Sequence, residues 1–86
     1  MSQVDFTIKD GFNNMDFERV TELLSKSYWS PDIKIQEVKQ GAVNSAIVVG
    51  AFNKEGRQIG FARAISDMTR FAYIMDVIVD ENYRRQ

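Results

Sequence analysis

The chain has 86 residues and therefore forms at most one small domain, since a chain of this size buries only about 60–65% of its unfolded surface. Hydrophobic residues make up 44% and charged residues 27%, a composition typical of a globular protein and not of a disordered tail or a membrane span. Eleven basic and 12 acidic residues give a net charge of −1, which argues against nucleic acid as a partner.

The first 28 residues predict a strand followed by a helix. The segment VDFTIKD (4–10) alternates apolar and polar residues, the pattern of a strand with one buried face, and Gly11 ends it. The apolar residues of that face are Val4, Phe6 and Ile8. In DFERVTELLSKSY (16–28) the apolar residues recur at helical spacing, and Asp16 is suited to the N-cap.

A second, shorter helix is predicted from the segment SPDIKIQEVKQG (30–41). Ser30 is suited to the N-cap and Pro31 to the first helical position. Asp32 complements the positive end of the helix dipole. Gly41 is expected to cap the C-terminus of this helix, because glycine readily adopts the left-handed conformation found there.

The second half of the chain predicts three strands joined by polar turns. The apolar run SAIVVGAF (45–52) and the segment RQIGFARAIS (57–66) flank NKEG, a typical hairpin turn. After a further turn, DMTR, the most apolar segment of the chain, FAYIMDVIV (71–79), is expected to be a central strand. The order strand, helix, helix, strand, strand, strand predicts one α+β domain over residues 1–86 with a mainly antiparallel sheet.

This order, together with the last residues, resembles the N-terminal half of the GCN5-related N-acetyltransferase (GNAT) family. In that family a strand with a Val-x-Val pattern is followed by a short acidic or proline-bearing turn. The motif [Arg/Gln]-x-x-Gly-x-[Gly/Ala] then opens a helix. The segment DVIVDENYRRQ (76–86) matches the strand, the turn and the first three positions of the motif. The sequence ends where the first glycine would come, so we expect an N-terminal portion of an acetyltransferase domain.

The resemblance implies acetyl-CoA as the cofactor of the complete protein. The pyrophosphate loop of the family places backbone N–H groups at the positive end of a helix, where arginines add charge. The residues expected at its entrance are Arg84, Arg85 and Gln86. The pantetheine arm pairs with the backbone of the fourth strand, which implies contacts from Val77, Ile78 and Val79. Without the glycine loop, the 86-residue chain alone is expected to bind acetyl-CoA weakly or not at all.

The reaction implied is attack of an amine, on a small molecule or a peptide, on the acetyl thioester. An alkyl ammonium with a pKa of about 10.4 is neutral only about once in 2,500 molecules at pH 7, so a proton acceptor is required. The sequence contains neither histidine nor cysteine. The acceptors expected on the fourth strand are therefore Tyr73, Asp76 and a water between them. The resemblance implies in addition that a backbone N–H near Val77 donates to the oxyanion.

Several of these residues have more than one interpretation. Asp76 interrupts an apolar strand and has three interpretations. In the first, the strand bulges there, with the side chain in solvent or capping a turn; in the other two, Asp76 binds the amine or acts as the base. Tyr73 is a core or sheet-face aromatic, or it is catalytic. By the resemblance, Tyr28 and Trp29 form an aromatic wall for the amine, unless Trp29 packs back onto its own helix. Arg63 faces outward or anchors an anion.

Two functions remain open at this point. The first is an N-acetyltransferase of which the chain is the N-terminal portion. The second is a non-catalytic half-fold that binds or regulates through its sheet edge. The coding sequence after Gln86 distinguishes them: a Gly-x-Gly and about 50–80 further residues favour the enzyme, and a stop codon favours the module.

The expected location is the cytoplasm, and the expected partner is a second copy of the chain. The N-terminus MSQVDFTIKD lacks the apolar core of a signal peptide, and no membrane partner is expected. The absence of cysteine suits a reducing compartment. In the complete family fold the fourth strand is interior to the sheet, but this chain lacks the fifth strand beside it, so residues 71–79 are expected at an edge, where an apolar strand is a template for another strand. We therefore expect a homodimer through residues 71–79, arranged about a two-fold axis.

Overall fold

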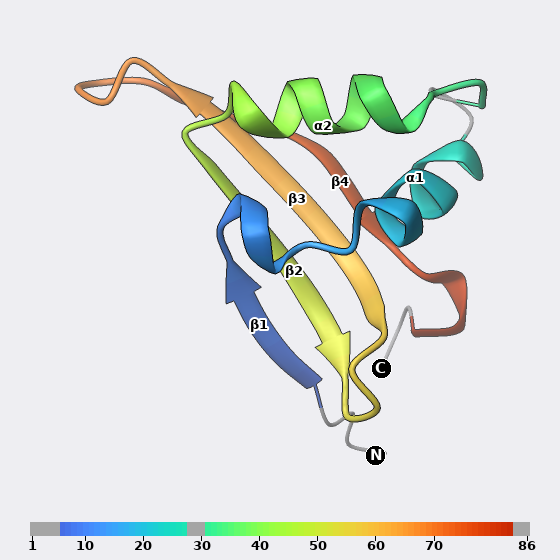
Figure 1. Cartoon of the computed structure of the whole chain (residues 1–86). Coiled ribbons are helices and arrows are strands. Elements are labelled where there is room, and N and C mark those ends of the chain that lie inside the picture. The colour runs from blue at the N-terminus through green and yellow to red at the C-terminus, as the bar shows by residue number, and fades with distance from the viewer. Residues whose placement is uncertain (1–5, 28–30, 84–86) are drawn as a thin grey trace.

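The computed structural model describes residues 6–27 and 31–83, and it has the order of helices and strands predicted from the sequence. The strands are β1 (Phe6–Asp10), β2 (Ile47–Asn53), β3 (Gln58–Ser66) and β4 (Ala72–Val79). The helices are α1 (Phe17–Ser25) and α2 (Ile35–Val43), with one-turn 3₁₀ helices at Phe12–Asn14 and Glu81–Tyr83. The predicted α+β class and strand-helix-helix-strand-strand-strand order are confirmed (Figure 1).

The four strands form one antiparallel sheet in the order β1-β2-β3-β4. The predicted NKEG hairpin joins β2 to β3, with Gly56 at a φ of 86°. The prediction that residues 71–79 form a central strand is wrong for the described part of the chain, where β4 has a strand neighbour on one side only. The reason is that each of the last three strands pairs with the strand before it, so the last one lies at the edge.

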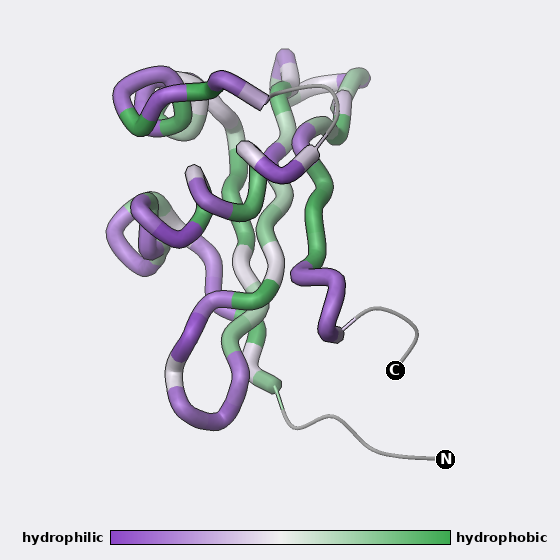
Figure 2. The backbone as a smooth tube through the Cα atoms, turned by 90° about the vertical axis from the view of Figure 1, so that its right-hand side faces the viewer, coloured by the Kyte–Doolittle hydropathy of each residue, from purple (hydrophilic) through white to green (hydrophobic). Residues whose placement is uncertain are grey.

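Both helices lie on the same side of the sheet (Figures 1 and 2). The hydrophobic core fills the space between the helices and the sheet. The apolar spacing on α1 turns Phe17, Val20 and Leu24 toward the sheet. Alternation along β2 does the same for Val48 and Phe52. The remaining members of the core are Met15, Leu23, Val38, Ala42, Phe61 and Ile78.

The expectation that the first strand buries Val4, Phe6 and Ile8 is wrong for Phe6 and Ile8, which are 54% and 59% exposed, and Val4 lies outside the described residues. The alternation itself is present, but the register pairs Thr7 with Phe52 and so turns Thr7 toward the helices. Phe6 and Ile8 consequently lie on the opposite side of the sheet, here called the open face. The alternation of apolar and polar residues therefore predicts that the strand has two different sides, but it does not predict which side the helices cover.

The second helix is shifted from its predicted limits. It begins at Ile35 after the N-cap Lys34, so Pro31 lies before the helix in a turn, and the predicted N-cap Ser30 lies outside the described residues. Gly41 is not the C-terminal cap, since the helix continues to Val43. A Cβ at position 41 would lie 3.2 Å from Arg63 Cζ, so the glycine makes room for an arginine from the sheet.

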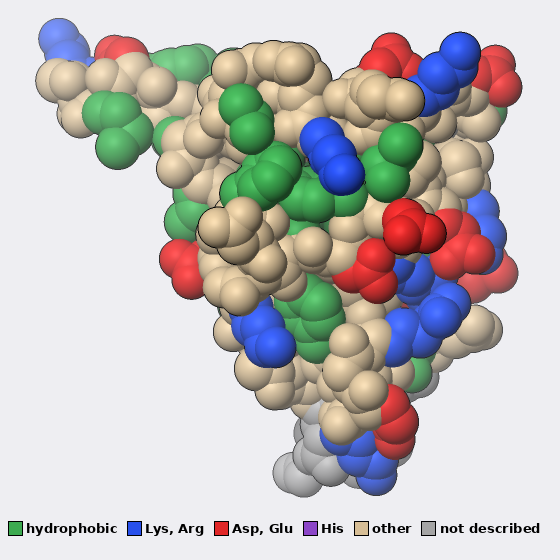
Figure 3. Space-filling model, viewed as in Figure 1, with side chains coloured by type: hydrophobic (Ala, Val, Ile, Leu, Met, Phe, Trp, Pro, Cys, Tyr) green, Lys and Arg blue, Asp and Glu red, His purple; other side chains and the backbone are tan. Residues whose placement is uncertain are grey.

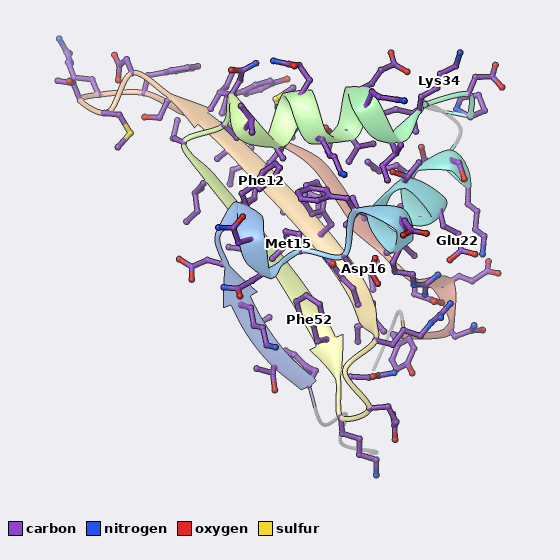
Figure 4. The ribbon with its side chains drawn as sticks, viewed as in Figure 1. Phe12, Met15, Asp16, Glu22, Lys34 and Phe52 are labelled. Atoms are coloured by element: carbon purple, nitrogen blue, oxygen red, sulfur yellow. The ribbon has the colours of Figure 1, made fainter. Side chains whose placement is uncertain are left out.

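A buried glutamine, which the sequence analysis did not identify, joins the start of α1 to β3. Gln58 is fully buried, its Oε1 accepts a hydrogen bond from the Asp16 backbone N–H at 2.9 Å, and its Nε2 donates to the Gly60 carbonyl at 2.9 Å. Asp16 is the N-cap, as predicted, and accepts from the Arg19 N–H at 3.2 Å. Figure 4 labels Asp16 and Met15 at this junction.

Replacing Gln58 with leucine is expected to lower the free energy of unfolding by about 2 kcal/mol, because the part-buried Asp16 N–H and the buried Gly60 carbonyl each lose a partner. Urea titration followed by circular dichroism measures the change. The matched control is Gln36→Leu on the exposed side of α2, which is expected to change stability by less than about 0.5 kcal/mol. Equal effects of the two substitutions would contradict the structural role of Gln58.

Candidate functional site

The candidate site is centred on a β-bulge in the middle of β4. Phe61 pairs with Ile78 and Arg63 pairs with Met75, so Ala62 of β3 faces two residues of β4, Asp76 and Val77. Asp76 has a φ of 57°, a left-handed conformation that is uncommon for a residue other than glycine. Bulges of this kind redirect the main chain and side chains of a strand and are frequent next to active sites.

The Asp76 side chain forms an ion pair with Arg63 rather than reaching solvent or capping a turn. Arg63 Nε donates to Asp76 Oδ2 at 2.7 Å, and the two side chains are only 18% and 20% exposed. The other end of the guanidinium reaches α2, where Nη1 lies 3.1 Å from Ser45 Oγ and 3.4 Å from the Gly41 carbonyl. Arg63 therefore does not face outward, and the anion that it binds in this structure is the Asp76 carboxylate.

Tyr73 lies on the same side of β4 as the Arg63 pair but not in the core. It pairs with Ile65, two positions from Arg63 on β3, so its side chain is on the helix side of the sheet. The outer end of the β3–β4 hairpin projects beyond α2 (Figure 1), and Tyr73 is 56% exposed there. The interpretation of Tyr73 as a core aromatic is therefore wrong, while a position on the face of the sheet is observed.

The end of β4 combines one buried side chain with two exposed ones. Ile78 is 6% exposed and belongs to the core, whereas Val77 and Val79 are 55% and 39% exposed. No other strand of the described chain lies along the outer edge of β4. The edge of a sheet is where an extended ligand can bond to main-chain groups as an added strand does.

Directly after β4, Asp80 joins the strand to α1 through Arg19. The guanidinium of Arg19 is bonded to the Asp80 carboxylate, donates from Nε to the Gln58 carbonyl at 2.8 Å, and pairs with Glu22 at 2.6 Å. The Asn82 backbone N–H donates to Asp80 Oδ1 at 2.8 Å. This N–H and, after it, Arg19 hold the pKa of Asp80 below its ordinary value of 3.8, against the opposing effect of burial.

Charged side chains gather around this junction on the face that carries α1 (Figure 3). Arg57 approaches Glu22 at 3.7 Å, and hydrogen bonding to Arg19 lowers the pKa of Glu22. Beside it, a cavity of about 110 Å³ is lined by Leu23 and Lys26 of α1 and by residues 78–82. Lys26 was not identified from the sequence, since nothing local to α1 indicates that its last turn reaches the end of β4.

Five of the residues proposed from the sequence lie outside the described part of the chain. They are Tyr28, Trp29, Arg84, Arg85 and Gln86. The aromatic wall and the entrance to the pyrophosphate site therefore remain predictions. Within residues 6–27 and 31–83, no three acidic side chains come together as they would at a metal site. No helix in the same ranges is long and apolar enough to cross a membrane.

Comparisons with solved structures identify similar folds. A protein named as an acetyltransferase of the GNAT family from Xanthomonas campestris matches 98% of the chain and 58% of its own length, with a TM-score of 0.85 and 30% identity. A protein from Deinococcus radiodurans R1, also named as an acetyltransferase, matches 99% of the chain and 60% of its own length, with a TM-score of 0.76 and 20% identity. No family model matches the sequence, and no curated protein sequence matches it significantly.

A GNAT-family acetyltransferase from Streptococcus pneumoniae gives a TM-score of 0.69 at 23% identity, over 94% of the chain and 57% of its own length. The chain thus spans about three fifths of each of these three structures. The class of protein defined by the fold is an α+β domain with a partial GNAT fold. The resemblance of the sequence to the GNAT family is confirmed by these structures.

Asp80 is expected to make stability sensitive to acid. Because its pKa is lowered in the folded state, its contribution is present above its ordinary value of 3.8 and is lost as the pH falls through the folded pKa. Asp80→Asn is expected to lower the free energy of unfolding by about 2 kcal/mol at pH 7, with the difference from the native protein shrinking below a pH of about 4.

Urea unfolding at a series of pH values between neutral and about 3 measures this difference. Glu81→Gln, on the neighbouring exposed carboxylate, is the matched control and is expected to follow the native protein at every pH. A constant difference between Asp80→Asn and the native protein over the whole range would show that the carboxylate charge is not responsible.

Proposed function

We propose that the full-length protein is an N-acetyltransferase that transfers an acetyl group from acetyl-CoA to an amine. The observation that carries the proposal is the bulge at Asp76 and Val77, on a strand whose outer edge is accessible, in a chain with a partial GNAT fold. Activity, cofactor and substrate class are proposed for the whole protein, because about two fifths of each matched structure lies outside the part that aligns with this chain.

Two features of the described residues support binding of the acyl donor at β4. In the described chain the outer edge of β4 has no neighbouring strand, and the resemblance predicts that the main-chain groups of Val77, Ile78 and Val79 contact the pantetheine arm. Beyond the strand, the cavity beside Lys26 brings a positive charge close to the segment that leads toward the predicted pyrophosphate entrance. When bound, acetyl-CoA supplies a thioester whose carbonyl carbon is attacked by the amine and whose thiol is the leaving group.

The chain contributes polarisation and orientation to this step. At the bulge the main chain departs from the regular ladder with β3, and a backbone N–H near Val77 is suited to donate to the developing oxyanion. Asp76 and Tyr73 remain the proposed catalytic residues on the helix side of the strand. Since one Asp76 oxygen is bonded to Arg63, this carboxylate is better suited to orient groups than to accept a proton directly.

Acetyl transfer by the full-length protein tests the proposal. Release of free thiol from acetyl-CoA is measured with panels of small primary amines, amino sugars and peptides. Asp76→Asn is expected to lower the turnover of the best substrate by about 100-fold with little change in affinity for acetyl-CoA. Asp10→Asn, an exposed position on β1, is the control and is expected to leave turnover unchanged.

Binding measurements separate the two proposed functions. The 86-residue chain alone is expected to bind acetyl-CoA weakly or not at all by calorimetry, and the full-length protein is expected to bind it. A sub-micromolar dissociation constant for the 86-residue chain, which corresponds to a binding free energy of about −8.2 kcal/mol or better, would show that the glycine loop is not required for binding acetyl-CoA. A full-length protein that neither binds acetyl-CoA nor acetylates any amine would favour the half-fold module instead.

The homodimer through residues 71–79 also remains a proposal, now with a narrower contact. Tyr73, Ile74 and Val77 are each more than half exposed on the edge strand. The bulge at Asp76 interrupts the regular backbone of that edge, a feature that limits strand pairing between chains. We therefore expect pairing of the 86-residue chain over residues 72–75 only.

Sedimentation of the 86-residue chain at micromolar concentration tests this contact. The expected result is a dimer that Ile74→Lys converts to a monomer, because the substitution places a charge in the apolar contact. Ile47→Lys, at an exposed position of β2 away from the edge, is the matched control. A native chain that sediments as a monomer at these concentrations would contradict the homodimer.

A further inference from the structure

Arg63 lies where β3, β4 and α2 meet, and it bonds to the other two elements at once. From β3, its Nε donates to Asp76 Oδ2 on β4 at 2.7 Å. Its Nη1 lies 3.1 Å from Ser45 Oγ and 3.4 Å from the Gly41 carbonyl, at the C-terminal end of α2. A planar guanidinium is suited to this arrangement because its donors point in fixed, divergent directions.

The C-terminal end of α2 is shaped to receive this side chain. Gly41 lacks the Cβ that would come within 3.2 Å of Arg63 Cζ. Ser45 Oγ donates to the Gly41 carbonyl at 2.7 Å, so the hydroxyl that contacts Arg63 is itself held in position. Glycine inside a helix is unfavourable in itself, and its presence at position 41 is explained by the close approach of the arginine.

The other end of the guanidinium holds a residue in an unfavourable conformation. Asp76 has a φ of 57°, which persists only where surrounding contacts favour it over the relaxed strand geometry. The described contacts that involve its side chain are those with Arg63. Loss of the arginine would leave a carboxylate that is only 20% exposed without its cation, at the position where the backbone is strained.

We infer that Arg63 is a positioning residue for acetyl transfer, which fixes the bulge of β4 and couples it to the C-terminal turn of α2. The inference rests on the proposed function, because the bulge carries the main-chain N–H assigned to the oxyanion. Arg63 acts on this N–H through Asp76 and does not contact the reacting atoms. Displacement of α2 would therefore change the geometry of the bulge even though the helix itself carries no reacting group.

The first measurement is amide hydrogen exchange in the full-length protein, which reports the bulge independently of catalysis. Arg63→Gln is expected to raise the exchange rates of the Asp76 and Val77 amides about tenfold or more relative to those of α1. Arg63→Lys is expected to do the same, since a single ammonium cannot reach Asp76 and Ser45 together. Arg57→Gln, at an exposed arginine next to the β2–β3 turn, is the matched control and is expected to have no effect.

The second measurement is the kinetics of acetyl transfer. Arg63→Gln is expected to lower kcat about tenfold or more while the KM for acetyl-CoA changes less than about twofold, because the cofactor contacts along residues 77–79 are retained. Gly41→Ala, which displaces the guanidinium without removing it, is expected to produce a smaller change in the same direction. If Arg63→Gln fails to fold, the double variant Arg63→Gln, Asp76→Asn, which lacks the unpaired carboxylate, replaces it in the exchange measurement, and Gly41→Ala carries the kinetic test.

The outcomes distinguish this inference from the proposed function. Bulge amides that exchange at the native rate in both Arg63→Gln and the double variant would overturn the inference, whatever the activity. Faster exchange with an unchanged kcat would overturn the positioning role, since the bulge would then not govern the reaction. A native protein without acetyl transfer, in which Arg63→Gln still accelerates exchange at the bulge, would refute the proposed function and leave the coupling of α2 to β4 supported.

Discussion

The buried guanidinium of Arg19 determines how α1 lies on the sheet. Its side chain is 5% exposed, and a charge removed from water to this extent must be fully paired. The partners come from three places: the Gln58 carbonyl on β3, Glu22 on α1 itself and Asp80 at the end of β4. Because all three partners bond to one planar guanidinium group, these contacts fix the position of the helix relative to the third strand and the end of the fourth strand.

A second arginine holds β4 at its middle, so the strand is fixed from the helix side at two points. Arg19 pairs with Asp80 just after the strand, and Arg63 pairs with Asp76 in the bulge. Between them, Ile78 packs into the core. All three contacts act on the helix side or at the end of the strand, and no described strand occupies its outer edge. This arrangement combines a strand held by side-chain contacts with an edge that has no neighbouring strand in the described chain.

Local features of the fold followed from the sequence, whereas features that depend on distant partners did not. The Asp16 cap and the NKEG turn were predictable because their chemistry lies within a few residues. Gly41 was misread as a cap because its partner, Arg63, lies 22 residues away. The alternation of Phe6 and Ile8 indicated a strand, but which face becomes covered depends on where the helices pack.

The candidate site shows the same division. The sequence showed that Asp76 is unusual, because it is the one carboxylate in an apolar strand and burial of an unpaired charge is unfavourable. Its partner was not evident, because the outward and inward positions of β3 cannot be assigned before the register with β2 and β4 is known. The role of Gln58 was equally hidden, since a polar residue at the start of a strand is ordinarily exposed.

The strand order has a consequence for how the chain reaches this structure. Strands β2, β3 and β4 are neighbours both in the chain and in the sheet, so they can pair by closing short loops at small entropic cost. Strand β1, in contrast, pairs with β2 across both helices, which makes its contacts non-local. Contacts between distant segments slow folding, so the hairpins are expected to form early and the N-terminal strand to dock late. Until β1 pairs with it, β2 is a sheet edge as well as β4, and an unpaired edge can pair with strands of other chains.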